Sequence, residues 1–168
     1  TVGVVITTDG SFTDISRSSY VVAEEKVVRD LKNCNKPFVM VLNSVHPNSS
    51  ETINLAKDLE KKYGVGVVSL DVANMVEDDV VKLFAKILEE FPVKNVCVKL
   101  PKWMQVLPFE HNLIQEVYAE ISKAISGFDK LGEFSMDFDL FDGSVNFDAK
   151  VTKTINAGDG RVEFEVSA

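Results

Sequence analysis

The sequence has few residues of the kinds that form disulfides or bind metal ions. It contains two cysteines and two histidines among 168 residues, and neither Cys34 nor Cys97 lies in a CxxC pair. This usage excludes a disulfide scaffold and favours reduced thiols in a cytosolic protein. His46 and His111 lie far apart, with no Cys or second His near either. We therefore expect no zinc site and no metal ligand in this chain.

The sequence also lacks long apolar runs and an excess of positive charge. No run approaches the roughly 20 apolar residues of a membrane-spanning helix. The opening Thr-Val-Gly-Val-Val-Ile has no initiator Met and no basic segment before it, so we interpret it as a strand of a mature chain or fragment and not as a signal peptide. The net charge is −8, and residues 129–168 carry nine acids and four bases. Nucleic acid and anionic membranes are therefore not expected as direct partners.

From its start to about residue 91, the chain repeats a strand, a polar loop and an amphipathic helix three times. The predicted strands are Val2–Ile6, Phe38–Leu42 and Val65–Leu70. The predicted helices are Ser19–Asn33, a segment from an Asn48/Glu51 capping box to Tyr63, and a segment from an Asn74/Glu77 capping box to Phe91. Strands that are apolar on both faces and alternate with helices predict an α/β fold, in which helices cover both faces of a parallel sheet.

The pattern changes after residue 91. Val93–Leu100 is predicted as a further strand, and a helix follows whose apolar face carries Leu113, Val117, Ile121, Ala124, Ile125 and Phe128. Apolar and polar residues then alternate in "GEFSMDFDL", "SVNFDAKV" and "RVEFEVSA". This alternation predicts an antiparallel β meander whose apolar face needs the helix as cover. We expect two domains: an α/β part over 1–100, and an incomplete α+β part over 101–168 with a connector, the helix and the meander.

Polar residues follow each predicted parallel strand. They are Thr7, Thr8 and Asp9 after the first, Asn43 and Ser44 after the second, and Ser69 and Asp71, with the apolar Val72, around the end of the third. Ligands of open parallel sheets bind at the carboxyl ends of the strands, so these loops define the expected ligand edge. The glycine-rich phosphate loops GxxxxGK[ST] and GxGxxG are absent. The residues alone predict a soluble α/β domain with a ligand edge and an incomplete set of chemical groups.

Three long stretches of the sequence carry a family resemblance. They are "GVVITTDGSFTDISRSSYVVAEEKVVRDLKNCNKPFVMVLNSVHPNSSET", "ANMVEDDVVKLFAKILEEFPV" and "LPKWMQVL". They closely resemble the stage IV sporulation protein A family of endospore-forming bacteria, nearly continuously from residue 3 to about 120. The segment from 132 onwards resembles the start of the middle region of that family. Long co-linear stretches of this kind are more specific than any short motif.

The resemblance implies a partial P-loop-NTPase-like α/β fold and an ATP hydrolase. Proteins of the family use ATP, with magnesium, to polymerise irreversibly into the base layer of the spore coat. The implied partners are other copies of the protein, a small amphipathic membrane-anchoring peptide and other coat morphogenetic proteins. The implied location is the mother-cell cytoplasm at the outer forespore membrane, with membrane contact made indirectly through regions absent from this chain.

The resemblance also suggests roles for the polar edge. In P-loop GTPases, the strand at the place of Phe38–Asn43 ends in Asn-Lys-x-Asp, whose Asp reads guanine. Here the stretch reads Asn43-Ser44-Val45-His46, so the Asn is kept and the guanine-reading Asp is absent, in keeping with an ATP-using family. Asn43 and Ser44, with Ser69, Asp71 and Val72 from the next strand end, would form the base side of a nucleotide site. Thr7, Thr8 and Asp9 would lie nearer the phosphates.

The phosphate-binding loop, the magnesium-binding aspartate and the γ-phosphate threonines of the family lie before the position that matches residue 1. No residue of this chain is therefore assigned a catalytic role, no cofactor is expected to bind it tightly, and the chain alone is not expected to hydrolyse ATP. A parallel sheet without its first strands would also expose a bare edge that favours pairing or aggregation. The alternative is a non-enzymatic self-association module with the α/β part as scaffold. A receiver-like domain is disfavoured because the first strand lacks an acidic pair at its end.

Overall fold

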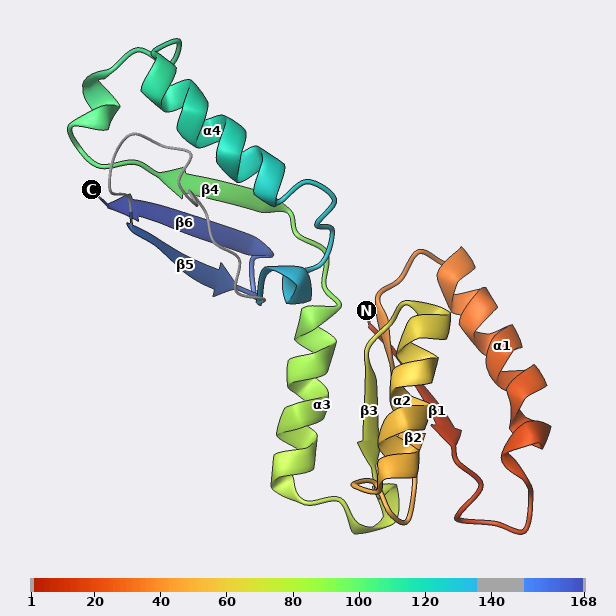
Figure 1. Ribbon diagram of the computed structural model, residues 1–168. Coiled ribbons are helices and arrows are strands. Elements are labelled where there is room, and N and C mark those ends of the chain that lie inside the picture. The colour runs from red at the N-terminus through yellow and green to blue at the C-terminus, as the bar shows by residue number, and fades with distance from the viewer. Residues whose placement is uncertain (1, 136–149, 168) are drawn as a thin grey trace. The chain divides into compact units, whose positions relative to one another are not determined.

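The computed structural model of the chain describes residues 2–135 and 150–167 (Figure 1). They form two compact units, Thr1–Glu90 and Phe91–Ala168. The strand predicted at Val93–Leu100 belongs to the second unit, so the division follows residue 90 and not residue 100. The physical reason is its pairing: β4 (Asn95–Lys99) forms parallel hydrogen bonds with β6 (Arg161–Ser167) of the second unit.

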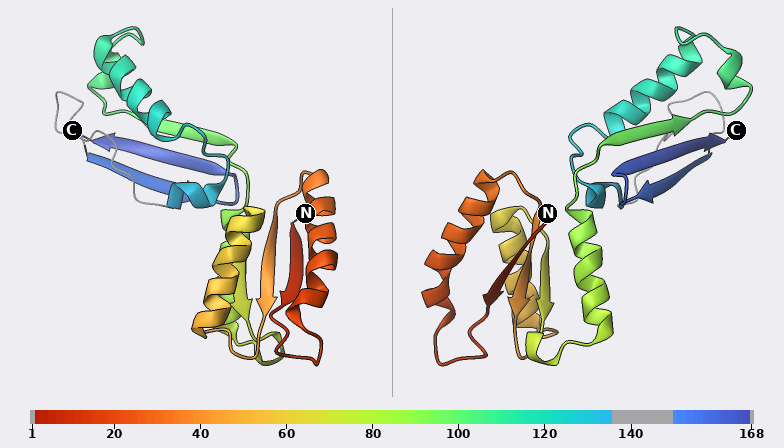
Figure 2. Two further views of the ribbon diagram at one scale, coloured as in Figure 1. Left: turned by 45° about the vertical axis from the view of Figure 1, so that its right-hand side comes forward. Right: turned by 180° about the vertical axis from the view of Figure 1, so that it is seen from behind.

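The first unit is a three-stranded parallel sheet with helices between its strands. Its elements are β1 (Gly3–Thr8), α1 (Arg17–Asn33), β2 (Phe38–Asn43), α2 (Ser50–Tyr63), β3 (Val67–Leu70), the 3₁₀ helix η1 (Val72–Asn74) and α3 (Glu77–Glu89). The strand order is β1-β2-β3, and all three strands run in the same direction (Figure 2). The α/β prediction is therefore confirmed.

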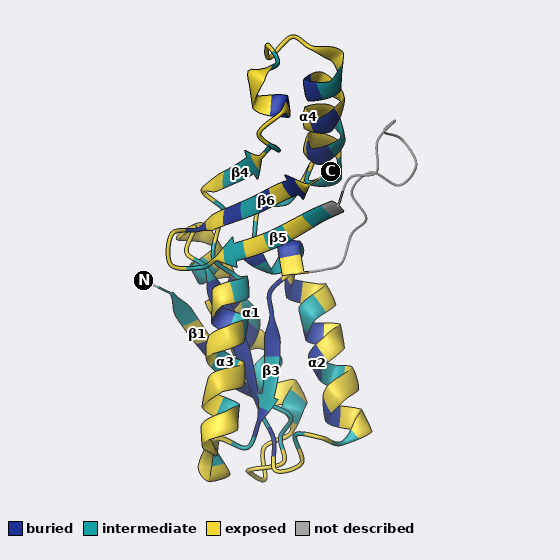
Figure 3. Cartoon of the chain, turned by 90° about the vertical axis from the view of Figure 1, so that its left-hand side faces the viewer, coloured by how far each residue is buried: buried dark blue, intermediate teal, exposed yellow. Residues whose placement is uncertain are grey.

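Helices cover both faces of this sheet. Val28 of α1 and Leu59 of α2 pack with Val5, Met40 and other residues on one face of the strands. Side chains alternate along a strand, so the neighbours of Met40, Val39 and Val41, face the other way, where α3 lies (Figure 3). Five consecutive residues of β2 are buried, as expected for the central strand of a sheet covered on both sides.

Local signals explain the helix ends, with two corrections. Gly64 ends α2 in the left-handed conformation at φ +66°, in agreement with the predicted helix end at Tyr63. The N-cap of α2 is Ser49 and not Asn48, since the Ser49 hydroxyl accepts a hydrogen bond from the Thr52 N–H at 3.2 Å. Asn74 does not cap α3, because it lies in η1 and its side chain donates to Asp71. Instead, the Asp79 carboxylate accepts the Val76 N–H in the first turn of α3 at 3.3 Å.

The second unit packs a helix on a three-stranded sheet. Its elements are β4, the 3₁₀ helix η2 (Met104–Val106), α4 (Asn112–Ala124), the 3₁₀ helix η3 (Leu131–Ser135), β5 (Lys150–Asn156) and β6 (Arg161–Ser167). β5 and β6 form an antiparallel hairpin, and Gly160 takes φ +64° in its turn. Val117 and Ile121 of α4 are buried against Val162 and Phe164 of β6, so the predicted covering helix is confirmed.

The predicted antiparallel meander is only partly correct. The sheet order is β4-β6-β5, and β4 runs parallel to β6, so the sheet is mixed. The start of "GEFSMDFDL" is not a strand, because residues 131–135 form η3, which buries Phe134 in the core. The expected core positions Met136, Phe138, Leu140, Val145, Phe147 and Ala149 lie outside the described residues.

Candidate functional site

The register of the parallel sheet brings the three polar loops to one edge. Thr8 at the end of β1 is level with Asn43, and Asn43 is level with Leu70 at the end of β3. The chain leaves all three strands at this edge, at the bottom of Figure 1. The three loops therefore meet at the expected ligand edge. What this edge can bind depends on which of its side chains are not already used in hydrogen bonds within the chain.

Asn43 connects the second loop to the third. Its Oδ1 atom accepts a hydrogen bond of 3.0 Å from the Val72 N–H. The Ser44 N–H also donates to the Leu70 carbonyl at 2.9 Å, which extends the pairing of the two strands. Among the residues that the structure describes, none accepts a hydrogen bond from the Asn43 side-chain NH₂ group. This edge therefore presents one amide donor next to Val72, which is 37 % exposed.

Ser44 supports the loop from inside. Its side chain is fully buried. Its hydroxyl accepts the His46 N–H at 3.0 Å and lies 3.3 Å from the Thr52 hydroxyl of α2. Ser44 follows Asn43 in the sequence, but its hydroxyl is used by Thr52, the His46 N–H and the Asp9 carboxylate.

The third loop is stabilised by its own acid. The Asp71 carboxylate accepts the N–H groups of Ala73 and Asn74 at 3.1 and 3.2 Å, and the Asn74 side-chain amide at 2.8 Å. These three donors occupy the carboxylate as the cap of η1. Ser69 lies one residue before the end of β3 and is half-buried. The base-side candidates therefore meet through Asn43 and Val72, whereas Asp71 shapes the turn.

Asp9 organises the first loop. Its Oδ1 atom accepts the Ser11 N–H at 2.9 Å and the Ser11 hydroxyl at 2.6 Å. Partial burial by itself raises the pKa of the Asp9 carboxyl, but hydrogen bonds from Ser11, Ser44 and Thr52 outweigh burial and hold the pKa below its ordinary value. Asp9 is thus a stable anion at neutral pH. It lies in an open cleft of about 570 Å³, together with Arg17 and residues at the start of α2.

Thr7 and Thr8 have different environments. The Thr8 hydroxyl accepts the Gly10 N–H at 3.0 Å within the loop. Thr7 is buried, and its hydroxyl donates to Glu24 of α1 at 2.5 Å. Thr7 therefore belongs to a polar network inside the unit, and Thr8 and Asp9 belong to the edge.

Sequence reasoning missed this buried network. Glu24 is 5 % exposed, forms an ion pair with Arg17 at 2.7 Å and accepts the Tyr63 hydroxyl at 2.8 Å. Burial raises the pKa of Glu24. Hydrogen bonds from Arg17, Thr7 and Tyr63 lower the pKa by more than burial raises it, so it lies below the ordinary value. A signal was present, because Glu24 lies four residues before the buried Val28 and therefore on the same helix face.

The described residues fit the base of a nucleotide better than its phosphates. Asn43 offers a donor at the edge, but the loops contain no glycine-rich cradle. Arg17, the cation in the cleft, is paired with Glu24. Within residues 2–135 and 150–167, no three His, Cys, Asp or Glu side chains are grouped to hold a metal ion. In the same residues, no helix is long and apolar enough to cross a membrane.

The fold and edge define the class: a parallel α/β unit consistent with part of a P-loop-like domain, followed by a small mixed-sheet unit. Residues 1–92 match the family model described as stage IV sporulation protein A, ATPase domain. The whole chain is 37 % identical to stage IV sporulation protein A of Bacillus subtilis (strain 168) and 34 % identical to that of Bacillus anthracis, and covers 34 % of each. Over 131 residues, or 78 % of the chain, it is 39 % identical to that of Clostridioides difficile (strain 630) and covers 27 % of it.

The chain belongs to the stage IV sporulation protein A family, as expected from the sequence. It spans about a third of the length of the relatives it matches. No solved structure matches the chain significantly.

Proposed function

We propose that this chain is the base-side part of a sporulation ATPase that polymerises on the outer forespore membrane to form the base layer of the spore coat. The observation that carries the proposal is the Asn43–Val72 hydrogen bond at the carboxyl edge of a parallel sheet. It occurs in a segment that matches the ATPase domain of the family. The sporulation role is supported by the names of the relatives.

Asn43 would recognise a purine through the group that the fold leaves available. Its carbonyl oxygen is already used by the Val72 N–H, so its NH₂ group would donate to an acceptor on the ligand, such as a purine ring nitrogen. Guanine additionally requires an acceptor for its two adjacent N–H donors, which a carboxylate supplies best. Val45 and His46 provide no carboxylate, and Asp71 is occupied by η1. These features favour adenine over guanine.

The phosphates and magnesium would be held by a segment of the protein outside this chain. β1 is an edge strand of the three-stranded sheet. Ile6 and Val4 on β1 are 62 % and 45 % exposed, and an apolar groove of about 460 Å³ runs beside the strand. Edge strands with such surfaces pair readily with further strands. A strand added here parallel to β1 would bring its own carboxyl end next to Thr8 and Asp9, on the side away from Asn43.

The remaining elements of the proposal rest on membership of the family. They are self-assembly into a polymer, location in the mother cell at the forespore surface, anchoring by a small amphipathic peptide and docking of other coat proteins. Each concerns the whole protein, of which this chain represents about a third by comparison with its relatives.

The test compares ATP and GTP turnover by the protein extended to the full length of its relatives with turnover by this 168-residue chain. We expect the long protein to hydrolyse ATP in preference to GTP and the short chain to hydrolyse neither. Turnover by the short chain would contradict the assignment of phosphates and magnesium to an outside segment. A lack of turnover in both would remove the ATPase proposal.

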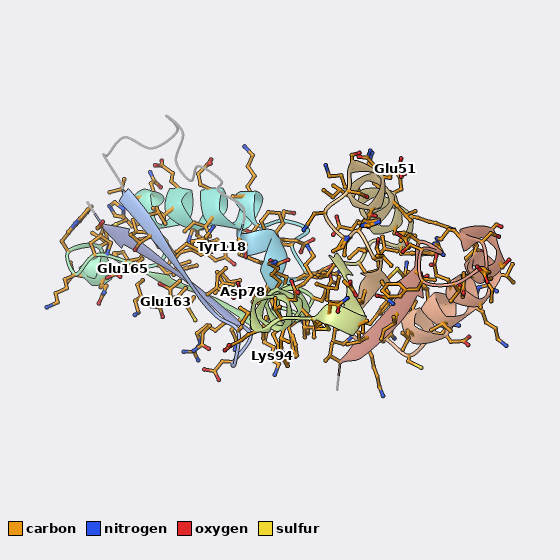
Figure 4. The ribbon with its side chains drawn as sticks, turned by 90° about the horizontal axis from the view of Figure 1, so that it is seen from below. Glu51, Asp78, Lys94, Tyr118, Glu163 and Glu165 are labelled. Atoms are coloured by element: carbon orange, nitrogen blue, oxygen red, sulfur yellow. The ribbon has the colours of Figure 1, made fainter. Side chains whose placement is uncertain are left out.

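One observation favours a non-enzymatic interaction module as the second candidate. Phe109 and Tyr118 of the second unit are 62 % and 59 % exposed, with ring centroids 6.2 Å apart in an edge-to-face arrangement. The opposite side of this unit is polar, and Figure 4 shows Glu163 and Glu165 on the face of β6 away from α4. If the long protein does not turn over ATP but assembles, and Tyr118→Ala abolishes the assembly, this second function replaces the first.

A further inference from the structure

The loop after β1 holds the loop after β2 through one side chain. The Ser11 hydroxyl accepts the Val45 N–H at 3.0 Å, across 34 residues of sequence. Gly10, at φ +92°, turns the chain so that Ser11 reaches the second loop. A Cβ atom at Gly10 would lie 3.1 Å from the backbone nitrogen of Arg17 and 3.2 Å from the carbonyl oxygen of Ile15. Position 10 therefore favours glycine for two reasons: its positive φ and the close approach of the Ile15 and Arg17 backbone.

Asp9 fixes the direction in which the Ser11 hydroxyl donates its proton. The Ser11 hydroxyl is 2.6 Å from Asp9 Oδ1, and a carboxylate is only an acceptor, so the hydroxyl proton points to Asp9. This leaves an oxygen lone pair of Ser11 for the Val45 N–H. Asp9 Oδ2 also faces the Thr52 hydroxyl of α2 at 3.5 Å, so the carboxylate is held from a second element. Asp9 and Ser11 together form a clamp, which we call the Asp9–Ser11 clamp.

The Asp9–Ser11 clamp acts on the segment that contains Asn43. The Asp9 N–H donates to the Asn43 carbonyl at 3.3 Å, and Ser11 holds Val45 two residues further along. On the other side, the Asn43 side chain is fixed by Val72. The Asn43–Val45 segment is therefore restrained by the first loop and by the third. Loss of the clamp frees one side of the segment without removing any side chain of the base site.

We propose that Asp9 and Ser11 are positioning residues for base recognition, which hold Asn43–Val45 in the conformation that receives the adenine ring. This inference rests on the proposed nucleotide site and adds the residues that set its affinity. This role replaces the phosphate-side role expected for Asp9 from the sequence, because the Asp9 carboxylate is already bonded by Ser11 and faces Thr52. The clamp should consequently affect how tightly the base is bound, and should leave phosphate binding and the chemical step unchanged.

The experiment measures KM and kcat for ATP in the full-length protein, together with inhibition by tripolyphosphate, which has the phosphates but no base. The variants are Ser11→Ala, Asp9→Asn and Ser11→Thr, the last of which keeps the hydroxyl. Ser16→Ala is the matched control, because it removes a hydroxyl from the same loop whose partners are Ser18 and Ser19 and not the second loop.

We expect Ser11→Ala to raise KM for ATP about fivefold, as the loss of one hydrogen bond implies, with kcat and tripolyphosphate inhibition unchanged. Asp9→Asn should act in the same direction, and Ser11→Thr and Ser16→Ala should behave as the unmodified protein. Equal weakening of ATP and tripolyphosphate, an unchanged KM in Ser11→Ala, or the same effect in Ser16→Ala would each overturn the inference while leaving the ATPase proposal intact. An unmodified protein that neither binds nor hydrolyses ATP would overturn both.

Discussion

The hydroxyl of Tyr63, in the last turn of α2, donates a hydrogen bond of 2.8 Å to the carboxylate of Glu24 in the middle of α1. Arg17 and Thr7 bind the same carboxylate, so one buried acid joins two helices and a strand. Removal of a buried charge with three partners is costly, because each of the three would be left without its hydrogen-bond acceptor.

Replacement of Glu24 by Gln should therefore destabilise the first unit. The substitution keeps the shape of the side chain but leaves the Arg17 guanidinium without its counter-charge. We expect a loss of roughly 1–3 kcal/mol in the free energy of unfolding, measured by urea denaturation. Glu25→Gln is the matched control, since Glu25 pairs with Lys62 on the surface at 2.6 Å and should contribute less than about 1 kcal/mol. Equal effects of the two substitutions would contradict a special role for the buried network.

The same network predicts how stability depends on pH. The pKa of Glu24 is lower in the folded chain than its ordinary value of 4.5, so the folded state binds the proton less readily than the unfolded state. Its stabilisation is complete above that ordinary value and is lost as the pH falls through the folded pKa. The stability difference between the unmodified chain and Glu24→Gln should consequently be constant near neutral pH and shrink below about pH 4.5. Urea denaturation at a series of pH values checks this, and a difference that grows on acidification would contradict it.

Two glycines with positive φ should respond differently to Ala. At Gly64, φ is +66° and a Cβ atom would meet nothing within 4 Å, so only backbone strain remains. We expect Gly64→Ala to cost about 1 kcal/mol. At Gly10 the same strain is joined by close contacts with the backbone of Ile15 and Arg17, so Gly10→Ala should cost roughly 2–3 kcal/mol. Thermal unfolding of both variants, side by side, measures the order. A larger loss at Gly64 would show that the contacts around Gly10 relax freely.

Asn43→Asp separates the structural role of Asn43 from its proposed role in recognition. The Asp side chain retains an oxygen for the Val72 N–H but replaces the NH₂ donor by an acceptor. We expect an unchanged melting temperature and a rise of about tenfold or more in KM for ATP in the full-length protein. Asn43→Ala removes both functions and should lower the melting temperature as well. An unchanged KM in Asn43→Asp would mean that the side-chain NH₂ group does not contact the base.

Much of the first unit follows from local sequence. Phe38–Leu42 is apolar at every position, and such a run between amphipathic helices already predicts a central parallel strand. Gly64 predicts the end of α2 because glycine takes the left-handed conformation at little cost. The caps at Ser49 and Asp79 were not predicted, because several neighbouring polar residues were compatible with the same helix start and only the hydrogen bonds of the folded chain distinguish them.

In the second unit, alternation predicted strands but not their partners. The period of two in "RVEFEVSA" gives one apolar and one polar face and is the same whether a neighbouring strand runs parallel or antiparallel. The parallel pairing of β4 with β6, which places β4 in the second unit, depends on contacts between residues some 66 positions apart, as for Asn95 and Arg161. No local pattern encodes such a contact.

The sequence by itself determined the α/β class, the polar edge and the family, because apolar periodicity and long co-linear similarity are properties of the order of residues. Only the tertiary structure decided what each polar residue does there. Asn43 binds Val72, Ser44 is buried, Asp71 caps its own turn and Ser11 holds Val45. Hydrogen bonds have short range and strict direction, so their partners are fixed only when the strands have brought distant loops within 3 Å of one another.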